Sequence, residues 1–265
     1  MQRKKVGIIG FGYIASFVYQ EIVTRPELGL DIAFVWNRSP ARLGDLPEQL
    51  ILNDLSDFAS RSADLVIEMC HPSISRDYGV AILAITDYMM LSVTAMADRE
   101  LGAELLDKAV ANGTSLFIPH GALVGADSLH EARDNWADVT ITFRKAPGSM
   151  DFSESGIDPT EIQSETVVYD GSVRGAAEKF PRNVNTMATC ALAGIGFDRT
   201  RGVVIVDPDA TAMSAEVIAH GKDGSLLETR KEEQAVGVSG TGMLLSQLGS
   251  IRRAAFGAGP GLTFV

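Results

Sequence analysis

Cysteine and long apolar runs are both scarce in this sequence. Its 265 residues include 2 cysteines, Cys70 and Cys190, which form no CxxC pair. This argues against a disulfide framework and a thiolate zinc site, and a reduced cytosol is the simplest environment for the chain. No run approaches the roughly 18 apolar residues of a membrane span. We expect a soluble cytoplasmic protein with no membrane partner.

Basic residues are outnumbered by acidic ones. The chain has 23 Lys and Arg residues against 34 Asp and Glu residues, which gives a formal net charge of −11. Such a surface repels phosphate backbones, so nucleic-acid binding is not expected as the main role. A local basic pocket for a phosphorylated cofactor remains compatible with this charge. No His, Cys, Asp and Glu cluster has the spacing of metal ligands, and we expect no metal site.

The first half of the chain alternates short apolar runs with helical patterns. We expect strands at 6–9, 31–36, 65–69, 89–93 and 115–118, and helices at 14–23, 78–86 and 100–112. Strand–helix alternation is typical of parallel βαβ units. The pattern therefore predicts an α/β fold with a doubly wound, dinucleotide-binding Rossmann domain over residues 1–120.

The sequence changes in character after about residue 121. Strands are expected at 139–145, 166–169, 202–206 and 216–219, with a buried helix at 184–193 and a loop at 146–160. These features predict an α+β second domain with a largely antiparallel sheet over residues 121–240. A helix at 241–256 is expected to return to the first domain.

A glycine motif follows the first expected strand. Residues 10–15 read GFGYIA, a G-x-G-x-x-A pattern that opens an expected helix. Gly10 permits the tight turn, Gly12 lets the backbone approach a pyrophosphate, and the helix N-terminus faces the phosphates. The motif predicts a dinucleotide site that includes Gly10, Gly12, Tyr13 and Ile14. A glycine-rich turn without a ligand is the alternative.

The end of the second expected strand bears on which dinucleotide binds. An acid at this point would bind the ribose hydroxyls of NAD, but residues 36–39 read WNRS. Asn37 avoids charge repulsion with a 2′-phosphate, and Arg38 and Ser39 can donate hydrogen bonds to it. The pattern favours NADP over NAD. The alternatives are use of both cofactors and a merely solvated Arg38.

Six further segments are characteristic in their order and spacing. They read CHPSIS at 70–75, SVTAMAD at 92–98, PHGALVGAD at 119–127, YDGSVR at 169–174, FPRNVNTMA at 180–188 and VDP at 206–208. Together they resemble the L-aspartate dehydrogenase family over nearly the whole chain. The GAxxGxD and FPxNxN patterns within them are far more specific than the glycine motif.

The resemblance implies NAD(P)-dependent oxidative deamination of L-aspartate to iminosuccinate and then oxaloacetate, or the reverse. The family's cofactor contacts from the GA segment and from the second asparagine of NxN correspond to Ala122 and Asn185. Ala95 is a further expected cofactor contact, and His71 is expected at the cofactor as well, chiefly to order its loop near the nicotinamide. Asn185 also fits the N-cap of the following helix. The resemblance further suggests a homodimer formed through the sheet of the second domain.

The sequence departs from the family at the histidine taken as the catalytic acid or base. This position, 30 residues after Asn185, is Ala215 here. His220 lies five residues further on, and in a strand an odd offset points two side chains to opposite faces. We therefore expect His220 to be a poor substitute, and we hypothesise that His120 has taken over the acid–base role or contacts a different substrate. A histidine packed at a strand end is the alternative for His120.

The two carboxylates of aspartate call for cationic partners. Arg144, Lys145 and Arg174 are the candidates, although each also fits a surface charge. Thr94 and Asn183 complete the expected substrate contacts. Three functions stay open: an aspartate dehydrogenase, a divergent dehydrogenase for another amino, imino or oxo acid, and a non-catalytic dinucleotide-binding protein.

Overall fold

The computed structural model describes residues 3–257, and this part of the chain divides into two compact units. Unit 1 comprises the chain up to Ser92, Arg99–Pro119 and the chain from Leu244. Unit 2 comprises Val93–Asp98 and His120–Met243. Val93–Asp98 thus groups with unit 2, although it lies inside the expected first domain of residues 1–120.

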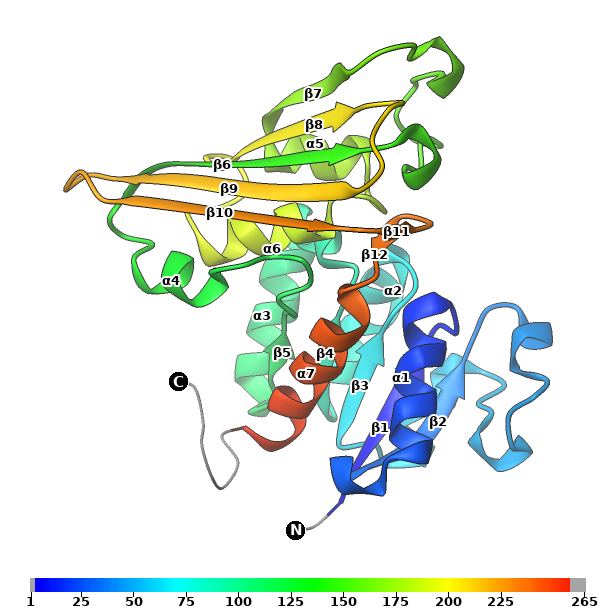
Figure 1. The fold of residues 1–265 in the computed structure, drawn as a ribbon. Coiled ribbons are helices and arrows are strands. Elements are labelled where there is room, and N and C mark those ends of the chain that lie inside the picture. Colours follow the sequence, from blue (N-terminus) through cyan, green and yellow to red (C-terminus); the bar gives the residue numbers. More distant parts are fainter. Residues whose placement is uncertain (1–2, 258–265) are drawn as a thin grey trace. The chain divides into compact units, whose positions relative to one another are not determined.

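Unit 1 contains a parallel sheet with the strand order β2-β1-β3-β4-β5 (Figure 1). Continuous apolar runs form its strands because both faces of a parallel sheet are buried. In Figure 1, α1 and α7 lie in front of this sheet, and α2 and α3 lie behind it. The elements are β1 (Lys4–Ile9), α1 (Tyr13–Thr24), β2 (Leu30–Trp36), β3 (Leu65–Glu68), α2 (Pro72–Leu83), β4 (Asp87–Met90), α3 (Arg99–Asn112), β5 (Leu116–Phe117) and α7 (Met243–Phe256).

Two expected elements of unit 1 have different bounds in the structure. The strand expected at 89–93 ends at Met90, because Ser92 turns out of the ladder and binds a buried carboxylate with its N–H and its hydroxyl. The helix expected at 78–86 is α2, which begins six residues earlier, at Pro72. His71 caps this helix, and a proline at the first helical position has the φ that a helix needs.

Unit 2 contains a second sheet, with the order β10-β9-β6-β8-β7. All its pairs are antiparallel except β6 with β8. The helices α5 and α6 lie along one face of this sheet (Figure 1). The elements are α4 (Ala126–Glu131), β6 (Trp136–Lys145), β7 (Thr166–Ser172), α5 (Val173–Lys179), α6 (Asn185–Ala193), β8 (Arg201–Val206), β9 (Met213–Gly221), β10 (Leu226–Glu233), β11 (Ala235–Val236) and β12 (Ser239–Gly240).

The sequence expectations miss β10 and end β7 too early. The strand β10 reads LLETRKEE and is an edge strand, so charged side chains replace the apolar alternation that marks a half-buried strand. The strand expected at 166–169 continues through Asp170 and Gly171 to Ser172. Asp170 accepts two hydrogen bonds from Arg201 on the neighbouring strand, which keeps this stretch extended. None of the helices within residues 3–257 has both the length and the apolarity to cross a lipid bilayer.

Candidate functional site

The turn between β1 and α1 requires glycine at Gly10. Its φ is +96°, and a Cβ at this position would lie 2.6 Å from the Cys70 Cβ. Its N–H donates to the Trp36 carbonyl at 2.7 Å. Gly10 therefore packs the turn closely against the chain that follows β3, and a hydrogen bond ties the same turn to the end of β2.

Gly12 meets no such constraint within the protein. A Cβ at Gly12 would meet no described atom within 4 Å, and φ is −102°, which any residue adopts. Gly12 is the N-cap of α1, and no side chain of the described chain caps this helix end. Tyr13, 42% exposed, and the partly buried Ile14 form the first turn. A small N-cap and uncapped N–H groups suit an anion such as a pyrophosphate, so the residues present fit a dinucleotide.

Asn37 ties the end of β2 to the glycine turn. Its Oδ1 accepts the Phe11 N–H at 3.0 Å, and its Nδ2 donates to the Ser39 carbonyl at 3.0 Å. Arg38 and Ser39 are exposed beside it, and Arg38 forms no ion pair within residues 3–257. The structure thus leaves a cationic side chain available at the end of β2.

A buried carboxylate that the sequence analysis does not single out lies at the end of β3. Glu68 is 0% exposed, and its Oε1 accepts the N–H groups of Cys70 at 2.7 Å and His71 at 2.8 Å and the Ser92 hydroxyl at 2.8 Å. Its Oε2 accepts the Ser92 N–H at 2.9 Å. Burial raises the pKa of the Glu68 carboxyl, and these hydrogen bonds act in the opposite direction. The available sequence signal is a lone acid closing an apolar strand, since acids are almost never buried without partners.

His71 caps α2 through its imidazole. The ring Nδ1 accepts the Ser73 N–H at 3.1 Å and lies 2.9 Å from the Ser73 hydroxyl. Because Nδ1 accepts a backbone N–H, the neutral ring carries its proton on Nε2. His71 therefore offers an N–H donor at the end of β3.

Asn185 does not cap α6, so that interpretation of the sequence is wrong. Val184 occupies the N-cap position, and the Asn185 Oδ1 instead accepts the Thr94 N–H at 3.2 Å. The Thr94 hydroxyl lies 3.2 Å from the same oxygen and donates to the Pro181 carbonyl at 2.6 Å. The next residue, Ala95, is buried. No described residue accepts from the Asn185 Nδ2, which leaves its two donors for a carboxamide or a ribose.

Asn183 and Lys145 are buried in unit 2 and bind backbone groups. The Asn183 side chain accepts the Asp151 N–H at 2.8 Å and donates to the Asp151 carbonyl at 2.6 Å. Lys145 is 1% exposed, and its Nζ donates to the carbonyls of Asn183 at 3.3 Å and Val238 at 3.2 Å. Burial lowers the pKa of Lys145 to about 8, and the charge of Glu233 opposes this shift. Both side chains already have partners within the protein.

His120 and Ala122 flank a tight turn at the start of the main segment of unit 2. Gly121 has a φ of +60°, and a Cβ there would lie 3.2 Å from the Thr186 hydroxyl. Ala122 is buried, and its N–H lies 3.4 Å from the same hydroxyl. The His120 Nε2 lies 3.7 Å from Asp127 Oδ1, and the His120 side chain is 38% exposed. This imidazole is therefore accessible.

The register of β9 confirms that Ala215 and His220 point to opposite faces. Ala215 pairs with Phe143, a buried residue of β6, and so lies on the face covered by the helices. His220 pairs with Asp138, and its Nδ1 lies 2.8 Å from Asp138 Oδ1 at an exposed position. His220 is thus an exposed partner of Asp138 and does not replace a histidine at position 215.

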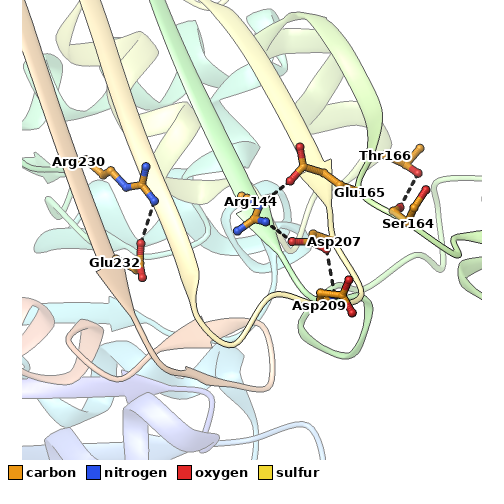
Figure 2. A network of polar contacts seen from close by, with 8 residues as sticks. All are labelled: Arg144, Ser164, Glu165, Thr166, Asp207, Asp209, Arg230 and Glu232. Carbon is orange, nitrogen blue, oxygen red and sulfur yellow. Dashed lines mark hydrogen bonds and ion pairs between the residues drawn. The ribbon is translucent and has the colours of Figure 1, made fainter.

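Arg144 points away from Lys145 because neighbouring residues of β6 alternate. Figure 2 shows its guanidinium between Glu165 and Asp207. The Arg144 Nε lies 2.9 Å from Glu165 Oε2, and its Nη2 forms an ion pair with Asp207. The buried Asp207 also accepts the Asp209 N–H at 2.9 Å. This network fastens the end of β8 to β6, and it uses Arg144 internally.

Arg174 is also engaged within unit 2. Its Nε and Nη2 lie 2.7 Å and 3.0 Å from the two carboxylate oxygens of Asp198, and its Nη1 donates to the Ala97 carbonyl. The guanidinium carbon lies 5.4 Å from the centre of the Phe197 ring. A bidentate pair with an aromatic contact is a fixed arrangement, so Arg174 holds the segment around Ala97.

Comparisons with known proteins agree with these motifs. Residues 127–245 match the family model described as aspartate dehydrogenase, C-terminal, and residues 10–119 match the homoserine dehydrogenase NAD binding domain. This second match supports a nicotinamide dinucleotide as the cofactor. The crystal structure of aspartate dehydrogenase from Thermotoga maritima has a TM-score of 0.76 at 24% identity and covers 99% of this chain and 100% of that chain. It shows that the fold is shared.

Sequence relatives extend the agreement to the family. The aspartate dehydrogenase domain-containing protein of Danio rerio is 36% identical over 242 residues, which are 87% of this chain and 87% of that protein. L-aspartate dehydrogenase 1 of Bordetella pertussis is 36% identical over 223 residues, 83% of each chain. At this identity over most of both chains, the protein belongs to the aspartate dehydrogenase family.

Proposed function

We propose that this protein catalyses the NAD(P)-dependent oxidative deamination of L-aspartate, or the reverse reaction. The observation that carries the proposal is the 36% identity to L-aspartate dehydrogenase 1 of Bordetella pertussis over 83% of each chain. The glycine turn supports it independently, because Gly12 and the uncapped end of α1 fit a dinucleotide.

The cofactor supplies the hydride acceptor or donor, and the chain supplies its binding and orientation. Asn37 and Arg38 are assigned to its adenosine ribose. The exposed Arg38, without an ion pair in the described chain, favours a 2′-phosphate and therefore NADP. The remaining proposed contacts lie along the recognised motifs: Gly10, Gly12, Tyr13, Ile14, His71, Ala95, Ala122 and Asn185.

His120 is the proposed acid–base residue. Oxidation at Cα requires the neutral amine, and the resulting imine needs an activated water, steps that a positioned base accelerates by about 10²–10⁴-fold. Ala215 has no titratable group, and His220 lies on the other face of its strand. His120 is accessible and lies two residues before Ala122. Its contact with Asp127 would stabilise the protonated imidazole formed during catalysis.

The polar residues expected at the substrate have other partners in the chain. Thr94, Lys145, Arg174 and Asn183 each bind a backbone carbonyl or N–H group in unit 2. We propose that they act on the substrate by fixing the loops of its binding site. Two unpaired cysteines are compatible with a cytoplasmic location.

A homodimer is proposed through the face of the unit 2 sheet that α5 and α6 do not cover. Several apolar or β-branched side chains on this face are only partly buried: Thr140, Thr142, Val203, Ile205 and Ile218. A second copy of the same face would bury them across a two-fold axis.

Steady-state assays with the purified protein test the proposed reaction. The protein should reduce NAD⁺ or NADP⁺ in the presence of L-aspartate but not in the presence of D-aspartate. The absorbance of the reduced cofactor measures the reaction. Turnover with other amino or oxo acids and none with L-aspartate would instead support a divergent dehydrogenase, which the alanine at position 215 favours as the second candidate. Cofactor binding without turnover of any acid would contradict both enzymatic proposals.

A further inference from the structure

Glu68 is a buried carboxylate for which the described chain provides no cation. It is 0% exposed and forms no ion pair with any Lys, Arg or His of residues 3–257. Its partners are the N–H groups of Cys70, His71 and Ser92 and the Ser92 hydroxyl. Three of these groups are N–H donors and the fourth donates its hydroxyl proton, which is the arrangement that an ionised carboxylate needs.

Burying a charge without a counter-ion costs free energy. We therefore expect the charge of Glu68 to have a function. Loops can be fastened by neutral groups as well, as the Asn183 amide does with both of its ends at Asp151. Glutamate at position 68 therefore provides two things that an amide would not: an acceptor for the Ser92 N–H on its second oxygen, and a net negative charge fixed at the end of β3.

The strand order places this charge at the ligand-binding edge of the sheet. Glu68 pairs with Ile9, the last residue of β1, directly before the glycine turn. The strand that follows β1 in the sequence, β2, lies on one side of it, and β3 lies on the other side. Dinucleotides bind at the carboxyl ends of the strands beside such a topological switch point. A dinucleotide bound there would place its adenosine half towards β2 and its nicotinamide half towards β3 and β4. Glu68 binds the N–H groups of His71 and Ser92, in the loops that follow β3 and β4.

We propose that Glu68 is a positioning residue that also sets the redox preference of cofactor binding: its fixed negative charge favours the oxidised cofactor, whose nicotinamide ring is cationic, over the reduced cofactor, whose ring is neutral. The inference rests on the nicotinamide cofactor and not on which amino acid is oxidised. Glu68 would then help to determine whether the oxidised or the reduced cofactor is bound more tightly.

Two variants distinguish the charge of Glu68 from its hydrogen bonds to the loops after β3 and β4. Glu68→Gln is isosteric and removes the charge, and its amide also loses the acceptor for the Ser92 N–H. Ser92→Ala removes one donor but keeps the carboxylate charged. A purely structural role predicts that both variants weaken the oxidised and reduced forms equally.

The measurement is isothermal titration calorimetry with NAD⁺, NADH, NADP⁺ and NADPH at about pH 8, well above the ordinary pKa of a glutamate, because burial raises the pKa of the Glu68 carboxyl. In Glu68→Gln the ratio of the oxidised-form Kd to the reduced-form Kd should rise on the order of tenfold over wild type, the size expected for one charge acting at about 10 Å through the protein. In Ser92→Ala the same ratio should stay within about threefold of wild type, even where both Kd values increase.

An unchanged ratio in Glu68→Gln, with both cofactor forms still bound, would overturn the proposal. If wild type binds neither form, the proposed function fails instead, so the two failures are distinguishable. Should Glu68→Gln not fold by circular dichroism, wild type itself decides. The carboxylate predicts that the oxidised form binds at least as tightly as the reduced form, and a reduced form bound on the order of tenfold more tightly would contradict it.

Discussion

The buried polar side chains of this protein mostly bind backbone groups. Lys145 donates to the carbonyls of Asn183 and Val238, and Asn183 binds both backbone groups of Asp151. A buried donor or acceptor has to be paired, and a loop that offers backbone groups to it is fixed at the same time. These side chains therefore link segments that are distant in the sequence, and the ionisation of Lys145 affects the stability of the fold.

Lys145 should make the stability of the fold rise with pH in the alkaline range. Its pKa is about 8 in the folded protein and 10.5 in the unfolded chain, so the unfolded chain binds more protons between these values. The free energy of unfolding should therefore rise by up to about 3 kcal/mol from about pH 8 to about pH 10.5, relative to a variant without this amine. Urea denaturation of wild type and Lys145→Met at about pH 7.5 and about pH 10 measures this difference. A difference between the two proteins that does not change with pH would show that the buried amine does not titrate in this window.

Arg38 should decide the preference between the two cofactors. A charge-assisted hydrogen bond to a 2′-phosphate contributes about 1.5–3 kcal/mol, so Arg38→Ala should weaken NADP⁺ binding roughly tenfold to a hundredfold. NAD⁺ has no group at this place, and its affinity should change less than about twofold. Arg42→Ala, at an exposed position four residues away, is the matched control. Equal losses for both cofactors in Arg38→Ala, measured by calorimetry, would remove the 2′-phosphate argument.

His120→Ala tests the proposed acid–base residue. With the base removed, kcat for L-aspartate should fall by about 10²–10⁴-fold, and the limb of the pH profile that reports the imidazole should disappear. Cofactor affinity should stay within about threefold, because binding does not require proton transfer. His130→Ala, at an exposed position of α4, serves as the control. An unaltered kcat and pH profile in His120→Ala would place the base elsewhere.

At the scale of the elements, the turn between β1 and α1 uses its two glycines differently. Gly10 is required by the fold, since φ is +96° and a Cβ would lie 2.6 Å from the Cys70 Cβ. Gly10→Ala should therefore lower the free energy of unfolding by about 2 kcal/mol or more. Gly12→Ala should change it by less than about 1 kcal/mol, because a Cβ there meets no described atom within 4 Å and the cost is that of alanine as a poorer N-cap. The cofactor affinity of Gly12→Ala should nevertheless fall at least about tenfold, because the alanine methyl group would occupy the space of the pyrophosphate.

Thermal unfolding and calorimetry of both glycine variants check this separation. A Gly12→Ala variant that binds the cofactor as wild type does would mean that the dinucleotide does not approach this turn. A Gly10→Ala variant of unchanged stability would mean that the turn can relax away from Cys70.

The helices and strands that sequence reasoning locates are those with a strong pattern. Buried strands such as β1 and β3 read as apolar runs, and β6 alternates, so the Rossmann sheet and the second sheet both follow from the sequence. The charged edge strand β10 has no such pattern and is missed. The end of β4 is misplaced for another reason: the apolar run continues, and only the bond from Ser92 to Glu68 ends the strand.

At the scale of the whole molecule, the chain passes between the two units after Ser92, Asp98, Pro119 and Met243. The sequence predicts the passage near residue 120 from a change in character, and the last passage from the helix expected at 241–256. It cannot predict the short excursion of Val93–Asp98, because the partners that group it with unit 2 lie about 90 residues later: the Thr94 bond to Asn185 spans 91 positions. The same holds for the site, where motifs identify Asn185 but only the fold identifies its partner.

The proposed dimer can be tested through the symmetry of its interface. Ile218 lies on the uncovered face of the unit 2 sheet, paired with Thr140 of β6. In a two-fold dimer each substitution occurs twice at one interface, so Ile218→Lys introduces two like charges into an apolar contact. Sedimentation should then show at least a tenfold weaker dimer, whereas circular dichroism should remain that of wild type, because the side chain is only partly buried within its own chain. Val110→Lys, at an 84% exposed position of α3, should leave the assembly unchanged. If Ile218→Lys sediments like wild type, the uncovered face is not the interface, and its partly exposed apolar side chains need another explanation.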